Sequence, residues 1–206
     1  MDEWQHVENA RRELADDLEP LEEGEWDKPS LCAQWRVRDV VAHLLDGTEI
    51  RMAGLMLGVA RNRFNVNRYL ANEAKRGGAC SPSVLLERLR ASAPSRAHPP
   101  FLKPITTLID VTIHGQDIRR PLGIRRPLPE ERVRLVLDTL KTIGYPFNAK
   151  KRAAGLTLRA TDMGWSHGEG PFVEGPGEAI AMFLARRPAA LSDLKGPGLA
   201  TLSTRL

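Results

Sequence analysis

The feature that most constrains the fold is a helical spacing of apolar residues through the first 122 residues. In four segments, apolar side chains recur every three or four positions, which places them on one face of an α-helix. Because each helix must bury that face against its neighbours, we predict an antiparallel four-helix bundle, with a polar, glycine-containing stretch over residues 62–80 between the second and third helices. The predicted helices cover residues 3–20, 37 to about 60, 82 (after the N-cap Ser81) to 92, and 105 to just before Pro121.

The rest of the chain has a different pattern. A proline-bearing linker, IRRPLPEE, leads into a predicted helix over residues 130–143. The alternation of Leu156, Leu158 and Ala160 predicts a short strand. The glycine-rich stretch WSHGEGPFVEGPGEA indicates a hairpin arm and a turn into a helix over 178–186, and leucines near the end predict a last short helix. We therefore predict an α+β fold with two domains, residues 1–124 and 125–206.

Composition limits the class of protein. The net charge is +4, but 30 basic residues are interleaved with 26 acidic ones and aromatics are only 5%, so nucleic-acid binding is disfavoured. No apolar run is long enough for a membrane span and the acidic start does not resemble a signal peptide, so we expect a cytoplasmic protein with no membrane partner. Cys32 and Cys80 are far apart, which argues against a cysteine-built zinc site and against a disulfide framework.

One constellation of residues points to a metal. In "LIDVTIHGQDIRRPLG", Asp110, His114 and Asp117 are spaced by four and then three residues, so they share one helical face. In "CAQWRVRDVVAHLLD", His43 lies on the flank of another predicted helix. If the two helices are neighbours, two imidazoles and one carboxylate converge, which suits a catalytic Zn²⁺ and also Ni²⁺, Fe²⁺ or Mn²⁺. Spacing alone leaves the alternative open: a hydrogen-bonded core histidine beside ordinary surface carboxylates.

The motifs "PSLCAQWRVRDVVAHL" and "DVTIHGQDIRRPLG" resemble the mycothiol-dependent maleylpyruvate isomerase family of the DinB-like superfamily. The resemblance extends over the C-terminal part, through "LTLRATD" and "GPGEAIAMFLARRP". It implies a metal-binding DinB-like bundle followed by a small α+β domain. It also implies that His43, Asp110 and His114 are the metal ligands, and that mycothiol, activated as a thiolate, is the cosubstrate.

The function that follows is transfer or isomerisation of a small electrophilic molecule by a metal-activated, low-molecular-weight thiol. The alternatives are a metal-binding or ligand-binding module without turnover and, less favoured, a DNA-associated regulator. The family uses a glutamate where this chain has Asp110, which is one methylene shorter. Arg36 also replaces a small hydroxyl residue, which predicts the loss of a helix N-cap. The electrophile, the choice between isomerase and transferase, and the oligomeric state stay open.

Other residues have two interpretations each. Asp117 could orient a ligand imidazole from outside the metal's own ligands, or pair with an arginine. Arg119 and Arg120 could bind a carboxylate of the cofactor or substrate, or form a solvated rim. Cys32 could be a nucleophile or a packed loop residue, and His167 part of a second metal site or a surface loop residue. We expect His6 and His98 on the surface, and Trp4 and Trp35 as core anchors rather than a substrate cage.

Overall fold

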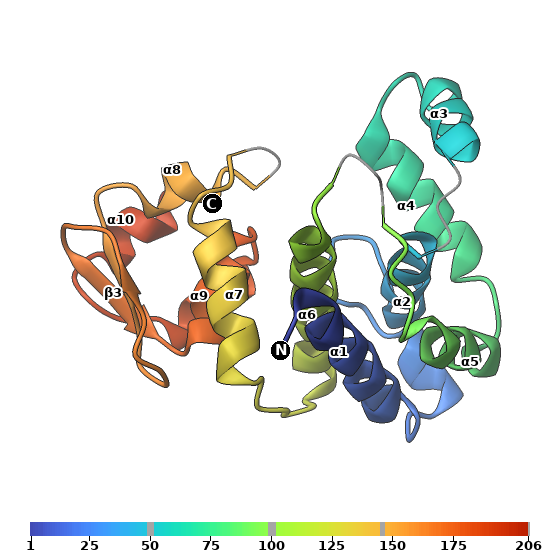
Figure 1. Ribbon diagram of the computed structural model, residues 1–206, viewed down its shortest axis with the longest axis horizontal. Helices are drawn as coiled ribbons and strands as arrows, with labels where there is room; N and C mark the ends of the chain where they lie inside the picture. Colours follow the sequence, from blue (N-terminus) through green and yellow to red (C-terminus); the bar gives the residue numbers. More distant parts are fainter. Residues whose placement is uncertain (49–51, 99–101, 145–146, 206) are drawn as a thin grey trace. The chain divides into compact units, whose positions relative to one another are not determined.

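The computed structural model describes residues 1–48, 52–98, 102–144 and 147–205. It divides into two compact units, Met1–Arg125 and Arg126–Leu206 (Figure 1). The first unit is helical and the second combines helices with a small sheet, so the chain has an α+β fold.

The first unit is built around helices that contact one another across its core. Helix α1 packs against α5 and α6, and α2 packs against α4, α5 and α6. The elements are α1 (Glu3–Leu18), the 3-10 helix η1 (Glu23–Asp27), α2 (Val37–Asp46), α3 (Met52–Arg61), α4 (Val66–Gly77), α5 (Pro82–Ser92) and α6 (Pro104–Leu122).

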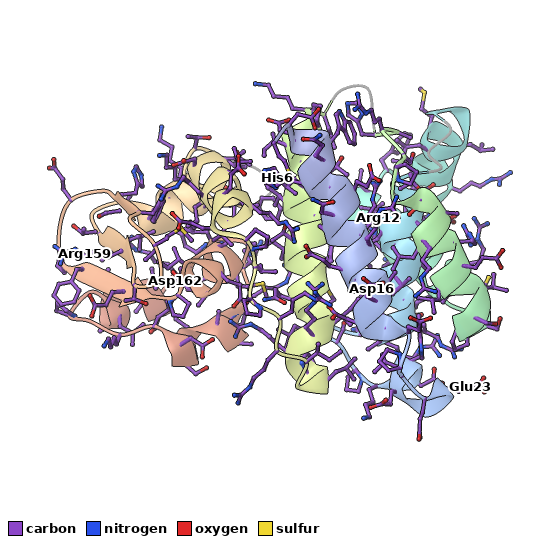
Figure 2. All side chains as sticks on the ribbon, turned by 60° about the horizontal axis from the view of Figure 1, so that its bottom comes forward. His6, Arg12, Asp16, Glu23, Arg159 and Asp162 are labelled. Atoms are coloured by element: carbon purple, nitrogen blue, oxygen red, sulfur yellow. The ribbon has the colours of Figure 1, made fainter. Side chains whose placement is uncertain are left out.

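Helix α1 shows how the sequence pattern produces this packing. Asp2 accepts a hydrogen bond from the backbone N–H of Gln5, and the Gln5 side chain accepts one from the Asp2 backbone, which satisfies two free N–H groups at the helix start. Arg12 and Asp16, one turn apart, are exposed on one side of the helix (Figure 2). The opposite side is buried against α5 and α6, and includes Val7, Ala10, Leu14 and Leu18.

Two predictions for the middle of the first unit were wrong. The helix predicted from residue 37 to about 60 ends at Asp46, and α3 is a separate element; residues 49–51, which the prediction spanned, lie outside the described residues. The polar stretch over 62–80, where no helix was predicted, contains α4, which begins after Asn65, whose side chain accepts from the Arg68 N–H. The stretch is polar overall and α4 buries only Ala74 among the described residues, so its few apolar residues were overlooked although they have helical spacing. Within the described residues, α3 and α4 therefore add to the four predicted helices, and the four-helix bundle itself stays a prediction.

The end of α6 also differs from the prediction. The helix was expected to stop before Pro121, yet it includes Pro121 and ends at Leu122. A proline in the last turn removes only its own N–H, and Gly123, with a φ of 71°, terminates the helix in the left-handed region. Glycine adopts this conformation at the least steric cost.

The second unit forms a three-stranded sheet with helices packed on it. Strand β1 is central, paired antiparallel with β2 and parallel with β3. The predicted strand, the hairpin arm and the last helices are therefore confirmed in position, although Leu206 lies outside the described residues. The elements are α7 (Glu130–Leu140), α8 (Ala149–Ala153), β1 (Thr157–Ala160), β2 (Ser166–His167), β3 (Phe172–Gly175), α9 (Gly177–Leu184), the 3-10 helix η2 (Pro188–Asp193) and α10 (Leu199–Ser203).

Helix length and hydropathy also bear on the membrane question. Among the described residues, no helix combines the length and the apolar character needed to cross a bilayer.

Candidate metal centre

The contact between α2 and α6 brings the three predicted ligands together. Nε2 of His114 lies 3.4 Å from Oδ1 of Asp110, and Nε2 of His43 lies 3.8 Å from Oδ2 of the same carboxylate. Asp110 and His114 are one helical turn apart on α6, while His43 comes from the last turn of α2. One carboxylate therefore faces two imidazole nitrogens from two helices.

The three side chains differ in exposure. The imidazoles of His43 and His114 are 15% and 12% exposed, whereas the Asp110 side chain is 42% exposed. A small molecule can therefore approach from the side of Asp110, while the protein covers the two histidines.

The electrostatics of the cluster favour opposite charges on its members. Burial disfavours the ionised form of Asp110, but the imidazoles of His114 and His43 outweigh it and hold its pKa below the usual value. Burial likewise disfavours protonated His114, yet Asp110, Asp117 and Cys32 raise the pKa of His114 well above its ordinary value. In the absence of a metal, the proton on His114 therefore supplies positive charge beside Asp110, as a metal cation would.

Asp117 and Cys32 lie behind His114. Oδ2 of Asp117, a fully buried carboxylate, lies 2.9 Å from Nδ1 of His114. The Cys32 thiol donates to the same oxygen at 3.0 Å and lies 3.4 Å from the same nitrogen. The loop carrying Cys32 is fixed by a hydrogen bond from the Leu31 N–H to the Asp117 backbone carbonyl, at 2.9 Å. Asp117 is thus positioned to hold His114 with Nε2 directed at Asp110.

Trp35 forms a wall of the site, which is closer to the disfavoured alternative of a substrate cage than to the expected core anchor. Its ring centroid lies 5.0 Å from that of His43 and 6.2 Å from that of His114. Trp35 is only partly buried, so the expectation of a core anchor was wrong; the tryptophans of the core are Trp26 and Trp165. The sequence signals for this position were that Trp35 precedes the helix of His43 by two residues and lies in the same motif as His43.

The residues present fit a metal ion. The donor atoms of His43, Asp110 and His114 lie within 4.8 Å of one another. Zinc ligands at about 2.1 Å in tetrahedral geometry are about 3.4 Å apart, so the observed separations are close to those of a loaded site. Nδ1 of His43 is buried and has no hydrogen-bond partner among the described residues, whereas Nε2 faces Asp110. Nε2 is therefore the nitrogen of His43 that could bind the metal. Cys32, His114 and Asp117 form a second group with donor atoms this close, so a cysteine belongs to the cluster.

Arg119 does not lie where a ligand could reach it. Its guanidinium is 3% exposed and Nε donates to Oδ2 of Asp17 at 2.6 Å, which ties α6 to α1. This placement favours the structural role over the cofactor-binding role. Arg120 is partly exposed.

Arg36 keeps part of the capping that its identity was predicted to remove. An arginine side chain offers no acceptor, but the buried Asp39 carboxylate accepts from the Arg36 backbone N–H at 2.9 Å and from its guanidinium. The free backbone N–H group of Arg36 at the start of α2 is therefore bonded by a side chain of the same helix.

Two histidine predictions need correction. His6, expected on the surface, is fully buried on α1. His167, expected in a loop, lies in β2 opposite Leu158 of β1. His98 is partly exposed and its ring packs against that of Trp4.

The fold and the site together define an α+β protein with a candidate centre of two histidines and one carboxylate between two helices. The family described as mycothiol maleylpyruvate isomerase N-terminal domain matches residues 7–100. These residues lie within the first unit, and the match confirms the resemblance seen in the sequence.

Two solved structures have a fold similar to that of this chain. The crystal structure of the mycothiol-dependent maleylpyruvate isomerase, and that of a histidine-to-alanine mutant of it, each match with a TM-score of 0.63. Each is 14% identical to this chain, and each match covers 95% of this chain and 91% of the other. At this identity the likeness shows a shared fold. A comparison with curated proteins finds no match.

Proposed function

We propose that the protein is a metal-dependent enzyme that uses a low-molecular-weight thiol, mycothiol in the first instance, to isomerise or to modify a small electrophilic molecule. The observation that carries the proposal is the convergence of the His43 and His114 Nε2 atoms on the single carboxylate of Asp110. The match of residues 7–100 to the mycothiol maleylpyruvate isomerase N-terminal domain supports the choice of thiol.

In this proposal His43, Asp110 and His114 hold the metal, with Zn²⁺ as the first candidate and Ni²⁺, Fe²⁺ or Mn²⁺ as alternatives. A bound divalent metal would lower the pKa of a ligating thiol and keep it as the thiolate. Asp110 supplies the negative charge that offsets the cation. Because its carboxylate is partly exposed, its side of the centre is where the thiol would enter.

The residues around the ligands have supporting roles. Asp117 accepts from Nδ1 of His114, so it fixes the tautomer in which Nε2 carries the lone pair for the metal. The Trp35 ring covers both imidazoles and keeps water from one side of the centre. We propose the cytoplasm as the location, as expected from the sequence.

The first test is the metal content of protein purified without added metal or chelator. The proposal expects about one divalent metal per chain, as for a site of three protein ligands. The His114→Ala variant should lose this metal, whereas His98→Ala, a change at a partly exposed histidine of the same unit, should keep it.

The second test is thiol-dependent turnover by the loaded protein. Maleylpyruvate with mycothiol is the first substrate pair, followed by other small electrophiles. Consumption that needs both thiol and metal supports the enzyme. Metal retained without thiol-dependent consumption of any electrophile class would favour a binding module, and absence of metal even after added zinc would mean that Asp110 does not complete the site.

A further inference from the structure

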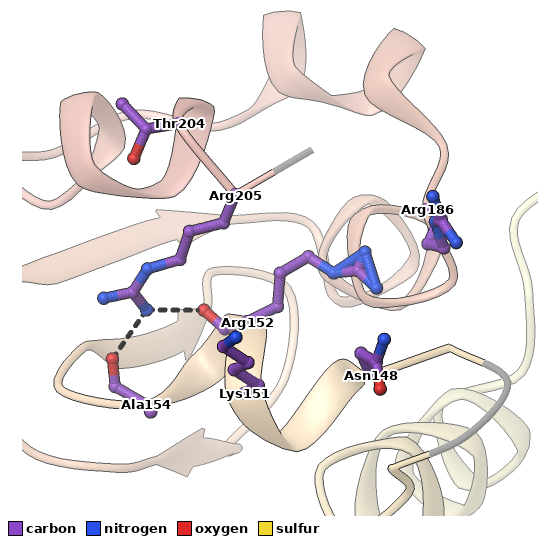
Figure 3. A pocket seen from close by; sticks show the side chains of 7 residues that line it. All are labelled: Asn148, Lys151, Arg152, Ala154, Arg186, Thr204 and Arg205. Atoms are coloured by element: carbon purple, nitrogen blue, oxygen red, sulfur yellow. Dashed lines mark hydrogen bonds between the residues drawn. The ribbon is translucent and has the colours of Figure 1, made fainter.

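The second unit contains a pocket of about 590 Å³ whose charged lining residues are all basic (Figure 3). Lys151 and Arg152 come from α8, Arg186 follows α9, and Arg205 follows α10. No aspartate or glutamate is among the lining residues. The pocket therefore concentrates positive charge in a concave surface of metabolite size.

Arg152 is the central observation. It is only 4% exposed, its Nε is buried without a hydrogen-bond partner, and among the described residues no carboxylate forms an ion pair with it. It packs over the Phe183 ring at 6.0 Å from the centroid. Burial, and after it the like charge of Arg186, lower the pKa of Arg152. A buried arginine normally has a partner of opposite charge, so an anion bound in the pocket would stabilise Arg152.

Two residues that line the pocket have left-handed backbone conformations, which glycine adopts at lower steric cost. Arg186 and Asn148, which both line the pocket, have φ angles of 69° and 51°. Arg186 occupies the position after a helix that usually holds glycine. Arg205 is held in place because Nη1 donates to the carbonyls of Arg152 and Ala154 at 2.7 and 2.6 Å (Figure 3).

We propose that this pocket binds a small dianionic ligand, carrying a phosphate group or two carboxylates, with Arg152 and Arg186 as its main contacts. The guanidinium group presents paired N–H donors that match phosphate and carboxylate oxygens. Lys151 adds charge at the rim, and the Asn148 amide can donate to a further oxygen. The site lies within the second unit and shares no residue with the candidate metal centre.

The test is calorimetric titration of the full-length protein with inorganic phosphate and, separately, with succinate, at constant ionic strength set by chloride. We expect saturable one-to-one binding of at least one probe with a Kd at or below about 1 mM. Saturation by phosphate alone would indicate a phosphate monoester as the natural ligand, and saturation by succinate alone a dicarboxylate. Binding should be unchanged in His114→Ala, which separates this site from the metal centre.

Three variants locate the binding. Arg152→Gln should weaken it about tenfold or more, since charge-assisted hydrogen bonds are lost. Arg186→Gly should weaken it as well but leave the melting temperature unchanged or higher, because glycine suits the left-handed backbone. Arg159→Gln removes the same charge from an exposed position on β1 (Figure 2) and should leave the Kd unchanged.

Two results would overturn the proposal. One is a signal for both probes that never saturates. The other is an equal loss of affinity in Arg159→Gln and Arg186→Gly, which would indicate general charge attraction. If Arg152→Gln fails to fold, the comparison between Arg186→Gly and Arg159→Gln still decides.

Discussion

The carboxylate of Asp117 lies 2.9 Å from Nδ1 of His114, on the side of the imidazole opposite to Asp110. His114 is therefore held between two carboxylates, one at each ring nitrogen. The outer carboxylate orients the ring and raises its basicity, which strengthens metal binding.

Replacing that outer carboxylate should weaken metal binding without removing it. We expect Asp117→Asn to lower zinc affinity by about 10- to 100-fold, the usual effect of losing an oriented partner of a ligating histidine. Competition with a chromophoric chelator measures the affinity, and Asp16→Asn on the exposed side of α1 is the control. An affinity equal to that of the unmodified protein would mean that Asp117 serves folding alone.

Loss of the ligand carboxylate should have a larger effect. Asp110→Asn keeps the shape of the side chain but removes the charge that faces both imidazoles, so we expect more than about 100-fold weaker zinc binding, beyond the range of outer partners. Asp110→Glu should keep the metal, since Asp110 is only partly buried and leaves room for one methylene. Retention of full affinity by the asparagine variant would remove Asp110 from the ligand set.

Metal binding should release a proton from His114. The pKa of His114 is raised in the metal-free protein, so near neutral pH its Nε2 must lose a proton before it can bind the metal. Zinc affinity should therefore fall as the pH falls, by about tenfold per pH unit while this one group stays protonated.

Calorimetry in two buffers of different ionisation enthalpy measures the released protons directly. About one proton per metal is expected from His114. In the metal-free protein, the ion pairing of His114 stabilises the fold at low pH. This stabilisation is lost as the pH rises through the raised pKa of His114. Zinc binding without proton release would contradict the assignment of His114.

The buried pair of Arg119 and Asp17 should matter for stability. Removing the guanidinium in Arg119→Ala leaves the Asp17 carboxylate buried beside α6, so we expect the free energy of unfolding to fall by about 3–5 kcal/mol. Denaturation by urea measures the change. Arg12→Ala breaks an exposed pair with Glu8 on the same helix and should cost less than about 1 kcal/mol. Similar losses in both variants would show that the Arg119 pair is not a structural bond between α1 and α6.

For some residues, the sequence pattern alone predicted the structural role. Ser81 followed by Pro82 predicted the start of α5, and the structure has that helix there, with the Ser81 side chain accepting from the Val84 N–H. The spacing of Asp110, His114 and Asp117 predicted one helical face, because local backbone geometry alone fixes which residues of a helix lie together.

Other features needed more than a local pattern. Helix α4 was not predicted because its stretch is polar overall, although its apolar residues have helical spacing. It packs so closely on α2 that a Cβ at Gly77 would lie 2.9 Å from the Ala42 side chain. The roles of Trp35 and Cys32 at the metal centre depend on a loop that the Leu31 N–H ties to the backbone of Asp117. Contacts between residues distant in the chain are set by packing, which no single-segment pattern contains.

The sequence by itself determined the helical first unit, the short strand that begins the second, and one face of the metal centre, since these depend on periodicities of a few residues. Only the tertiary structure decided that His43 meets Asp110, that Asp117 and Cys32 support His114, and that Arg119 is buried against Asp17. It also placed Arg152, Arg186 and Arg205 around one pocket. Apart from Asp117 and His114, which are neighbours on one helix, these residues come from segments distant in the chain, and burial of the apolar faces of their helices brings them together.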